Sequence, residues 1–539
     1  MKGVVATTPP LAAEVGVQIL ESGGNAVDAA VATAFAQTVT DPWMCGMGGF
    51  GTANIYMADT GTNIAVQFFA RAGSKVRPDQ WVDQGARQVN PGGMCNWVFD
   101  DFRNEIGYTS VCVPGTVAGL HEIHQRFGSI SWERVLALPI ELAKNGWKVT
   151  PIHEAYWTSP PGEGKPEQKL RLTATEPCQR LYTREDGSVL QAGDLYVNGD
   201  MARTLERLAL EGAGDFYQGE IGATLAQAFE EHGAHVTGDD LAEYRVRVVE
   251  PLQVEYRGYT MSGDPPPSGG YIVLQMLKIL EGYPLAEMGH NSADYLHVLA
   301  GAMAIAQDDR RKFEGDVEFV QVPVEYLLSD EYLTQCRRRI DAGDFPQATY
   351  TNEHPQNTTI LTTADANGNI ASINHTLGTG SGVVVPGLGF VLNNFMNGFH
   401  LSPSHPNGMA PGKATAAPFA PVMVFGADGS PVLATGAPGG TKIVSAVLQT
   451  ILNVIEFNMG AQEAVCAARI HHEGGPLQAE SRVTSLVLNE LKKRGHELEV
   501  SLEAYDRGLA SPHVSMFRNG QLHGGADPRR GGSVLFSQK

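Results

Sequence analysis

The chain has 539 residues, 42% hydrophobic and 18% charged, which is an ordinary globular balance for two to four domains or one large α/β unit. Its net charge of −20 argues against a nucleic-acid backbone or an anionic membrane surface as a partner. No apolar run is long enough to span a membrane and no signal peptide is visible, so we expect a cytoplasmic protein, or a periplasmic or secreted one if the N-terminus was trimmed.

The first half of the chain is predicted to alternate helices with strands. Residues 11–22 and 25–39 carry apolar side chains at helical spacing, and Asn25 is a candidate cap for the second helix. A glycine-rich turn after residue 41 leads into a strand, and residues 63–73 form another. Helices are predicted over 115–146 and within 200–245, whereas 151–200 is irregular and polar.

The second half reads as hairpins interleaved with helices. Strands are expected within 251–270, followed by helices at 271–282 and 292–312. A hairpin with strands at 359–364 and 370–373 turns at residues 365–369, and a second hairpin at 422–441 ends in a glycine pair. A buried helix and further strands complete the chain. The sequence therefore predicts a mixed α/β protein with long antiparallel stretches.

Six scattered cysteines have neither a C-x-x-C pair nor the spacing of metal ligands. We expect no metal and no other cofactor, and thiols that belong to a reducing compartment.

The triplet Asn357-Thr358-Thr359 stands where an irregular segment gives way to the first hairpin. Taken alone, a threonine at the head of a strand is simply a good β-former. The stretch G-A-P-G-G-T at 436–441 is, in the same way, most often a turn.

A set of longer motifs gives both stretches another meaning. The chain resembles the γ-glutamyltransferase family of N-terminal-nucleophile hydrolases over nearly its whole length. The motifs occur in the family's order: ESGGNAVDAAVA (21–32), GMGGFG (46–51), GDFYQGEIG (214–222), DDLAEYRV (239–246), YRGYTMSGDPPPSGG (256–270), NTT (357–359), DANGNIASINHTLG (365–378), LNNFMNGF (392–399), GAPGGTKI (436–443), ARIHHEG (468–474) and ADPRRGG (526–532).

The resemblance implies an α/β fold of four layers, αββα, with two antiparallel sheets at its centre. It also implies that the precursor cleaves itself between Asn357 and Thr358. The products are a large subunit, residues 1–357, and a small subunit, residues 358–539, which form one intertwined catalytic unit. Whether two of these units form a dimer is left undecided by the sequence. The expected partner is a small-molecule amide substrate, and neither a nucleic acid nor a membrane is expected.

The chemistry follows from the new chain end. A threonine hydroxyl is a weak nucleophile, but the freed α-amine of Thr358 has a reference pKa of about 7.7–8.0 and can act as its base. The backbone N–H groups of Gly439 and Gly440 resemble the family's oxyanion hole. Thr376 matches a threonine that contacts the nucleophile and assists cleavage, with a plain cross-strand role as the alternative. We interpret His375 as a strand side chain.

The chain departs from the family where the substrate's amino-acid group is recognised. The arginine of D-F-R-E is replaced by Phe69, and the serine pair of P-L-S-S-M-S-P by Ala417 and Pro418. The positions that match the polar contacts of the α-amino group are Gly378, Phe395 and Gly398.

These replacements predict an apolar or aromatic acyl group in place of a glutamyl group. Arg71 lies two positions beyond the lost arginine on the same strand face, so it is a candidate substitute for the charge. The loop from Phe399 to Pro411 is short, which suits a bulky substrate or water as the acceptor.

Three hypotheses remain from the sequence. The first is a self-processing hydrolase or acyltransferase for a non-glutamyl amide. The second is a γ-glutamyl hydrolase or transferase with a rearranged pocket. The third is a non-catalytic relative that stays a single chain, against which the intact triplet and glycine pair argue.

Overall fold

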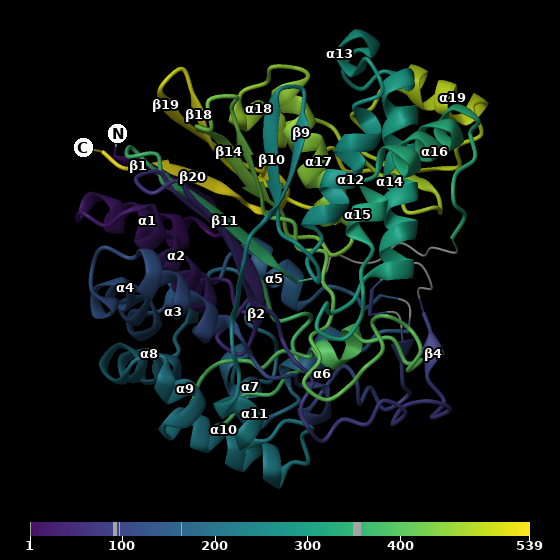
Figure 1. Cartoon of the computed structure of the whole chain (residues 1–539). Helices are drawn as coiled ribbons and strands as arrows, with labels where there is room; N and C mark the ends of the chain where they lie inside the picture. The colour runs from purple at the N-terminus through teal and green to yellow at the C-terminus, as the bar shows by residue number, and fades with distance from the viewer. Residues whose placement is uncertain (1, 90–93, 96, 163, 349–356, 539) are drawn as a thin grey trace.

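The computed structural model describes residues 2–89, 94–95, 97–162, 164–348 and 357–538 as one uncleaved chain (Figure 1). Two antiparallel sheets lie face to face, and a layer of helices covers the outer face of each. This is the four-layer αββα arrangement expected from the resemblance. None of the described helices has the length and hydropathy needed to cross a bilayer.

The first sheet has seven strands in the order β20-β1-β11-β12-β2-β3-β8, and all its pairs are antiparallel. Its strands are β1 (Gly3–Thr7), β2 (Phe50–Met57), β3 (Thr62–Phe68), β8 (Arg247–Val249), β11 (Thr359–Asp365), β12 (Ile370–Thr376) and β20 (Ser533–Phe536). The hairpin β11–β12 turns at residues 366–369, as the Asp-Ala-Asn-Gly-Asn sequence predicts. It therefore lies in the middle of the sheet, between β1 and β2.

The second sheet has six strands in the order β19-β18-β14-β13-β10-β9. Its strands are β9 (Leu252–Tyr256), β10 (Tyr259–Gly263), β13 (Val422–Phe425), β14 (Pro431–Gly436), β18 (His513–Arg518) and β19 (Gln521–Ala526). A small apolar core, which includes Val4, Ala364 and Met423, joins the two sheets at one end. The other end of the space between the sheets holds polar side chains, and the candidate site is there.

The helix layer on the first sheet is built around a helix with no exposed face. Every residue of α2 (Ala26–Thr40) is buried, and Asn25 caps it by accepting hydrogen bonds from the N–H groups of Val27 and Asp28. An Ala-rich sequence suits this position because small side chains let a helix pack closely on all sides. The accompanying helices are α1 (Pro10–Glu21), α3 (Thr116–Phe127), α4 (Trp132–Asn145), α8 (Gly199–Glu211), α9 (Gly214–Gln218), α10 (Glu220–Glu231) and α11 (Gly238–Ala242).

The helix layer on the second sheet comes from two distant parts of the chain. Apolar side chains of α12 and α14 pack with those of α17 and of the sheet in one core. The helices on this side are α12 (Gly270–Leu280), α13 (Leu285–Met288), α14 (Ala293–Phe313), α15 (Val324–Leu327), α16 (Asp330–Asp341), α17 (Lys442–Ile455), α18 (Ala461–Cys466) and α19 (Ser485–Lys493). A small sheet of β15 (Ile470–His471), β16 (Leu477–Ala479) and β17 (Leu498–Val500) lies at this side of the molecule.

The segment 151–200 differs from the irregular chain that the sequence predicts. It contains α5 (Pro151–Trp157), α6 (Gln168–Leu172) and α7 (Glu176–Tyr182), with β7 (Leu195–Tyr196) paired to β6 (Trp147–Lys148). Each helix has at most seven residues, too few to show a helical period, and their buried residues include Trp157, Leu172 and Tyr182. Tertiary packing, not local propensity, stabilises them. The remaining short pair is β4 (Arg87–Gln88) with β5 (Trp97–Val98).

Candidate active site

The predicted nucleophile lies at the head of β11, opposite the predicted assisting threonine. Thr359 pairs with His375 across the hairpin, so Thr358 faces Thr376. Because side chains alternate along a strand, Thr358 shares a face with Thr362, whose hydroxyl accepts a hydrogen bond from the second sheet. The head of the hairpin therefore directs both hydroxyls into the space between the sheets, where Thr358 is only 6% exposed.

The two hydroxyls meet at the carbonyl oxygen of the bond that is predicted to break. Thr358 Oγ1 and Thr376 Oγ1 each donate to Asn357 O at 2.5 Å, and the two hydroxyl oxygens are 3.2 Å apart. The N–H of Gly378 donates to Thr376 Oγ1 at 3.0 Å, which orients that hydroxyl. Hydrogen bonds to a carbonyl oxygen stabilise the negative charge that develops there when the carbon is attacked. The carbonyl of the Asn357–Thr358 bond is therefore polarised by two hydroxyls, one of which belongs to Thr358 itself.

His375 lies on the opposite face of β12 and points at helix α2. Its Nε2 donates to Gln37 Oε1 at 2.9 Å, and the Gln37 amide donates in turn to Thr359 Oγ1 at 2.8 Å. Complete burial lowers the pKa of His375 to about 3, so its ring is neutral at physiological pH. This agrees with its interpretation as a strand side chain, and the Gln37 contacts fix both strands of the hairpin to α2.

The glycine pair lies between β14 and α17, close to the same end of the hairpin. Asn374 on β12 donates to the carbonyl of Ala437 at 2.9 Å, which joins the start of this turn to the strand that carries Thr376. Gly439 and Gly440 have φ values of +140° and +60°, where L side chains are strained. Among the residues that the structure describes, no hydrogen bond uses the N–H of either glycine as donor. Two backbone donors are thus available beside the hairpin.

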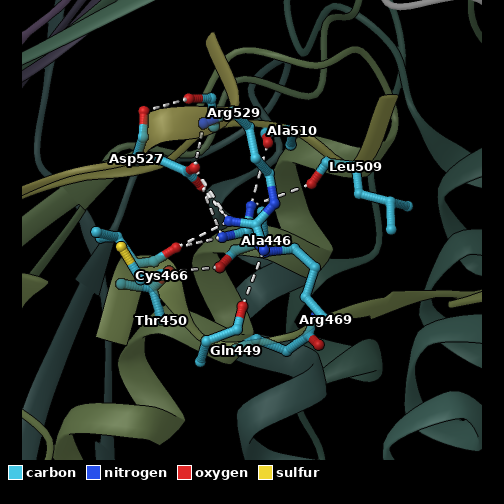
Figure 2. A network of polar contacts seen from close by, with 12 residues as sticks. Ala446, Gln449, Thr450, Cys466, Arg469, Leu509, Ala510, Asp527 and Arg529 are labelled. Atoms are coloured by element: carbon cyan, nitrogen blue, oxygen red, sulfur yellow. Dashed lines mark hydrogen bonds and ion pairs between the residues drawn. The ribbon is translucent and has the colours of Figure 1, made fainter. Parts of the chain in front are cut away.

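Two buried arginines, Arg469 and Arg529, converge on Asp527 beside Ala510, which contacts the glycine turn (Figure 2). A side chain at Gly439 would place its Cβ 2.7 Å from the Cβ of Ala510. Arg469 donates to the carbonyl of Ala510 at 3.1 Å and to Asp527 at 2.8 Å, and Arg529 also pairs with Asp527. The motifs ARIHHEG and ADPRRGG, which the sequence leaves without a role, therefore meet in space and fix the segment against which the glycine turn packs.

A cavity of about 780 Å³ opens beside Asn357 and extends to Lys442 at the start of α17. Its wall includes a buried ionic group that the sequence does not predict. Glu105 pairs with Lys165 and Arg171, each at 2.7 Å. Burial raises the pKa of Glu105, but the two cations outweigh this and lower it to about 2, so the carboxylate is ionised. The wall of the cavity that Asn357 lines is therefore polar at this ionic group.

The predicted recognition positions lie together but not in this cavity. The rings of Phe69 and Phe395 both pack on Phe50, with centroids at 6.5 and 4.3 Å, and Phe419 completes the cluster. The neighbouring predicted positions are Gly378, Gly398, Ala417 and Pro418. These aromatic side chains are buried and pack against one another. Their role as a binding pocket stays a prediction.

Arg71 is already engaged with other charges. Its Nη1 lies 2.8 Å from Glu318 and 3.8 Å from Asp316, and it donates to the carbonyl of Gly412 at 3.0 Å. A guanidinium in this position already has carboxylate partners. The geometry does not favour Arg71 as a substitute for the lost arginine.

Comparison with known proteins gives a consistent result. The family model described as Gamma-glutamyltranspeptidase matches residues 12–537. The chain is 35% identical over 505 residues to the "Acylase ACY 1 proenzyme" of Pseudomonas sp. (strain SE83), covering 92% of this chain and 87% of the relative. It is 33% identical over 559 residues to the "Glutathione hydrolase proenzyme" of Bacillus subtilis (strain 168), covering 99% and 91%.

A solved structure is similar over the same length. The cephalosporin acylase from Bacillus halodurans superposes with a TM-score of 0.87 at 30% sequence identity, covering 99% of this chain and 95% of that one. The fold therefore matches across both sheets and both helix layers.

Proposed function

Since the chain belongs to the gamma-glutamyltranspeptidase family, we propose that it is a self-processing amide hydrolase whose nucleophile is Thr358. The observation that carries the proposal is the convergence of the hydroxyls of Thr358 and Thr376 on the carbonyl oxygen of Asn357. The word proenzyme in the names of both curated relatives is consistent with a precursor that must be processed.

Self-processing begins with attack of Thr358 Oγ1 on the carbonyl carbon of Asn357. The new C–O bond forms, the C–N bond breaks, and the hydroxyl proton passes to the nitrogen of Thr358. Thr376 stabilises the oxygen of the intermediate through its hydrogen bond. Water then hydrolyses the ester, which leaves a carboxylate on Asn357 and a free amine and hydroxyl on Thr358.

Turnover uses the same hydroxyl with its new base. The α-amine of Thr358 takes the hydroxyl proton as Oγ1 attacks the substrate amide, and returns it to the leaving amine. The N–H groups of Gly439 and Gly440 donate to the oxyanion. Water, activated by the same amine, releases the acyl group. Residues 1–357 and 358–539 act as the large and small subunits in this scheme.

We further propose that the acyl group is not γ-glutamyl. Phe69, Ala417 and Pro418 occupy the positions where the family's transferases place an arginine and two serines, and none of the three offers a charged partner. A zwitterionic group that loses water there without new hydrogen bonds costs about 1–3 kcal/mol for each unpaired polar group. The similarity to proteins named acylases supports this choice.

The test compares substrates on one preparation of the processed protein. Amides with apolar, aromatic or small oxo-acid acyl groups, including acylated cephalosporin amines, should have a kcat/KM at least about 10²-fold above that of glutathione and γ-glutamyl p-nitroanilide. Efficient hydrolysis of glutathione would instead support the alternative, a γ-glutamyl hydrolase with a rearranged pocket, which the similarity to glutathione hydrolases keeps open.

A further inference from the structure

A buried carboxylate lies directly behind the glycine turn. Glu473, which follows β15, accepts a short hydrogen bond from Thr441 Oγ1 and a second from His471 Nε2 at 2.6 Å. His471 Nδ1 is 2.8 Å from the hydroxyl of Ser445 on α17. The order Ser445–His471–Glu473 is that of a catalytic triad, but each side chain is at most 2% exposed and none lines the cavity beside Asn357. These three residues therefore have a structural role and do not form a second catalytic site.

The carboxylate keeps its charge in this position. Burial raises the pKa of Glu473, but His471 and Arg310, together with the hydrogen bonds from His471 and Thr441, lower it to about 2. Arg310 Nη2 lies 3.9 Å away on α14 and is buried as well. Glu473 is therefore ionised throughout the neutral range, and a charged acceptor holds a hydroxyl more strongly than a neutral one.

Thr441 is the residue that receives this support. It occupies the cap position of α17, yet its side chain makes no cap hydrogen bond and donates to Glu473 instead. Its carbonyl accepts a hydrogen bond from Gln307 on α14 at 2.9 Å. The hydroxyl and the carbonyl of Thr441 are thus fixed by partners outside the helix, immediately after the glycine pair.

We propose that Glu473 is a positioning residue which, through Thr441, holds the N–H groups of Gly439 and Gly440 in the geometry of an oxyanion hole. Two consecutive glycines adopt many backbone conformations, so the donors stay aligned only if a neighbour is fixed. Donors must also be organised before the reaction to stabilise a developing charge. This inference rests on the proposed function, because it assigns the glycine pair to the same hydrolase.

The test uses isosteric substitutions on the complete chain. Thr441→Val removes the donor and Glu473→Gln removes the charge. Each should lower kcat by about 10- to 100-fold with KM nearly unchanged, because misplaced donors act mainly in the transition state. Thr441→Ser keeps the hydroxyl and should stay within about threefold of the wild type. Because Glu473 acts through Thr441, the double variant should lose no more than the worse single variant.

Self-cleavage provides an internal control. The carbonyl oxygen of Asn357 accepts hydrogen bonds from Thr358 and Thr376, not from the glycine turn. The Thr441 and Glu473 variants should therefore still be cleaved, which also reports that they fold. Asp309→Asn is the matched control, since Asp309 is a buried acceptor on α14 that binds Gln275 and Tyr332 and does not contact Thr441.

The outcomes separate the two proposals. A cleaved wild type that hydrolyses no amide in the acyl screen contradicts the proposed function itself. An active wild type whose Glu473→Gln and Thr441→Val variants keep full kcat contradicts only the positioning role. The positioning role is also contradicted if the losses of kcat in the two single variants add up in the double variant. It is contradicted as well if Asp309→Asn loses as much kcat as Glu473→Gln, because both results indicate general damage to the core.

Discussion

At the scale of single residues, we predict that self-cleavage depends on the hydroxyl of Thr376. Thr376→Val keeps the shape of the side chain but removes the donor to Asn357 O, so we expect cleavage to slow by about 10²–10³-fold. The conversion of precursor to fragments, followed on denaturing gels after synthesis, measures this. Thr362→Val is the matched control, because Thr362 lies on the same sheet face and its hydroxyl bonds, among the described residues, only with Ser515. Cleavage of Thr376→Val at the wild-type rate would show that the carbonyl needs no such donor.

The pH profile of turnover identifies the base. If the α-amine of Thr358 takes the hydroxyl proton, kcat/KM should rise with pH near the reference pKa of an α-amine, about 7.7–8.0, since only the unprotonated amine is active. His375 cannot produce this limb, because its own pKa is lowered to about 3 by burial. The profile of His375→Asn should keep a limb at the same pH. A limb near pH 6.5 that disappears in this variant would assign the base to the histidine.

At the scale of the elements, the proposed cleavage at Asn357–Thr358 divides the chain into two parts whose strands are interleaved in one sheet. β11 and β12 of the small fragment lie between β1 and β2 of the large fragment, with backbone pairing on both sides. The two fragments should therefore elute together from a sizing column under native conditions and separate only in denaturant. Fragments that separate without denaturant would contradict the pairing of β11 and β12 between β1 and β2.

The sequence predicts contacts between residues that are close together along the chain better than contacts between residues that are far apart. The hairpin and the opposition of Thr358 to Thr376 follow from a local turn and from the alternation of strand side chains, so they were predictable. The hydrogen bonds that support the glycine turn could not be predicted in this way. Thr441 looks like an ordinary helix cap, and its acceptor Glu473 lies 32 positions further along the chain. Only the known motifs signalled that these stretches matter.

The aromatic cluster shows a second limit of the sequence. Matching motifs place Phe69 and Phe395 at recognition positions, but nothing local indicates that both rings pack on Phe50. Phe50 lies in the motif GMGGFG (46–51), where the glycines suggest a special backbone conformation and nothing points to the aromatic ring. Side-chain packing between three separate segments is a tertiary property, so the shape of an acyl pocket cannot be read from these positions alone.

At the scale of the whole molecule, buried histidines set the response to acid. Burial lowers the pKa values of His153, His472 and His513 to about 4, so these rings are neutral in the fold and gain protons on unfolding below pH 6.5. The unfolded state then binds more protons, and stability falls as pH drops from 6.5 toward 4, by about 1.4 kcal/mol per pH unit for each group.

Thermal unfolding of the single-chain Thr358→Ala variant measures this dependence without interference from cleavage. We expect a steady decrease of the midpoint as the pH falls below about 6.5. His153→Gln should make the decrease shallower, because it removes one titrating ring while an amide can still donate to the carbonyl of Thr40. A midpoint that stays constant down to pH 5 would contradict the account of neutral buried histidines.

The central claim, that Thr358 becomes the catalytic chain end, is tested most directly by intact-mass measurement with N-terminal sequencing of the purified protein. The 57.8 kDa chain should give fragments of about 38 and 19 kDa, and the smaller should begin Thr-Thr-Ile-Leu, while Thr358→Ala stays one inactive chain. An active protein that remains a single chain, or a small fragment that begins at another residue, would contradict the assignment of Thr358.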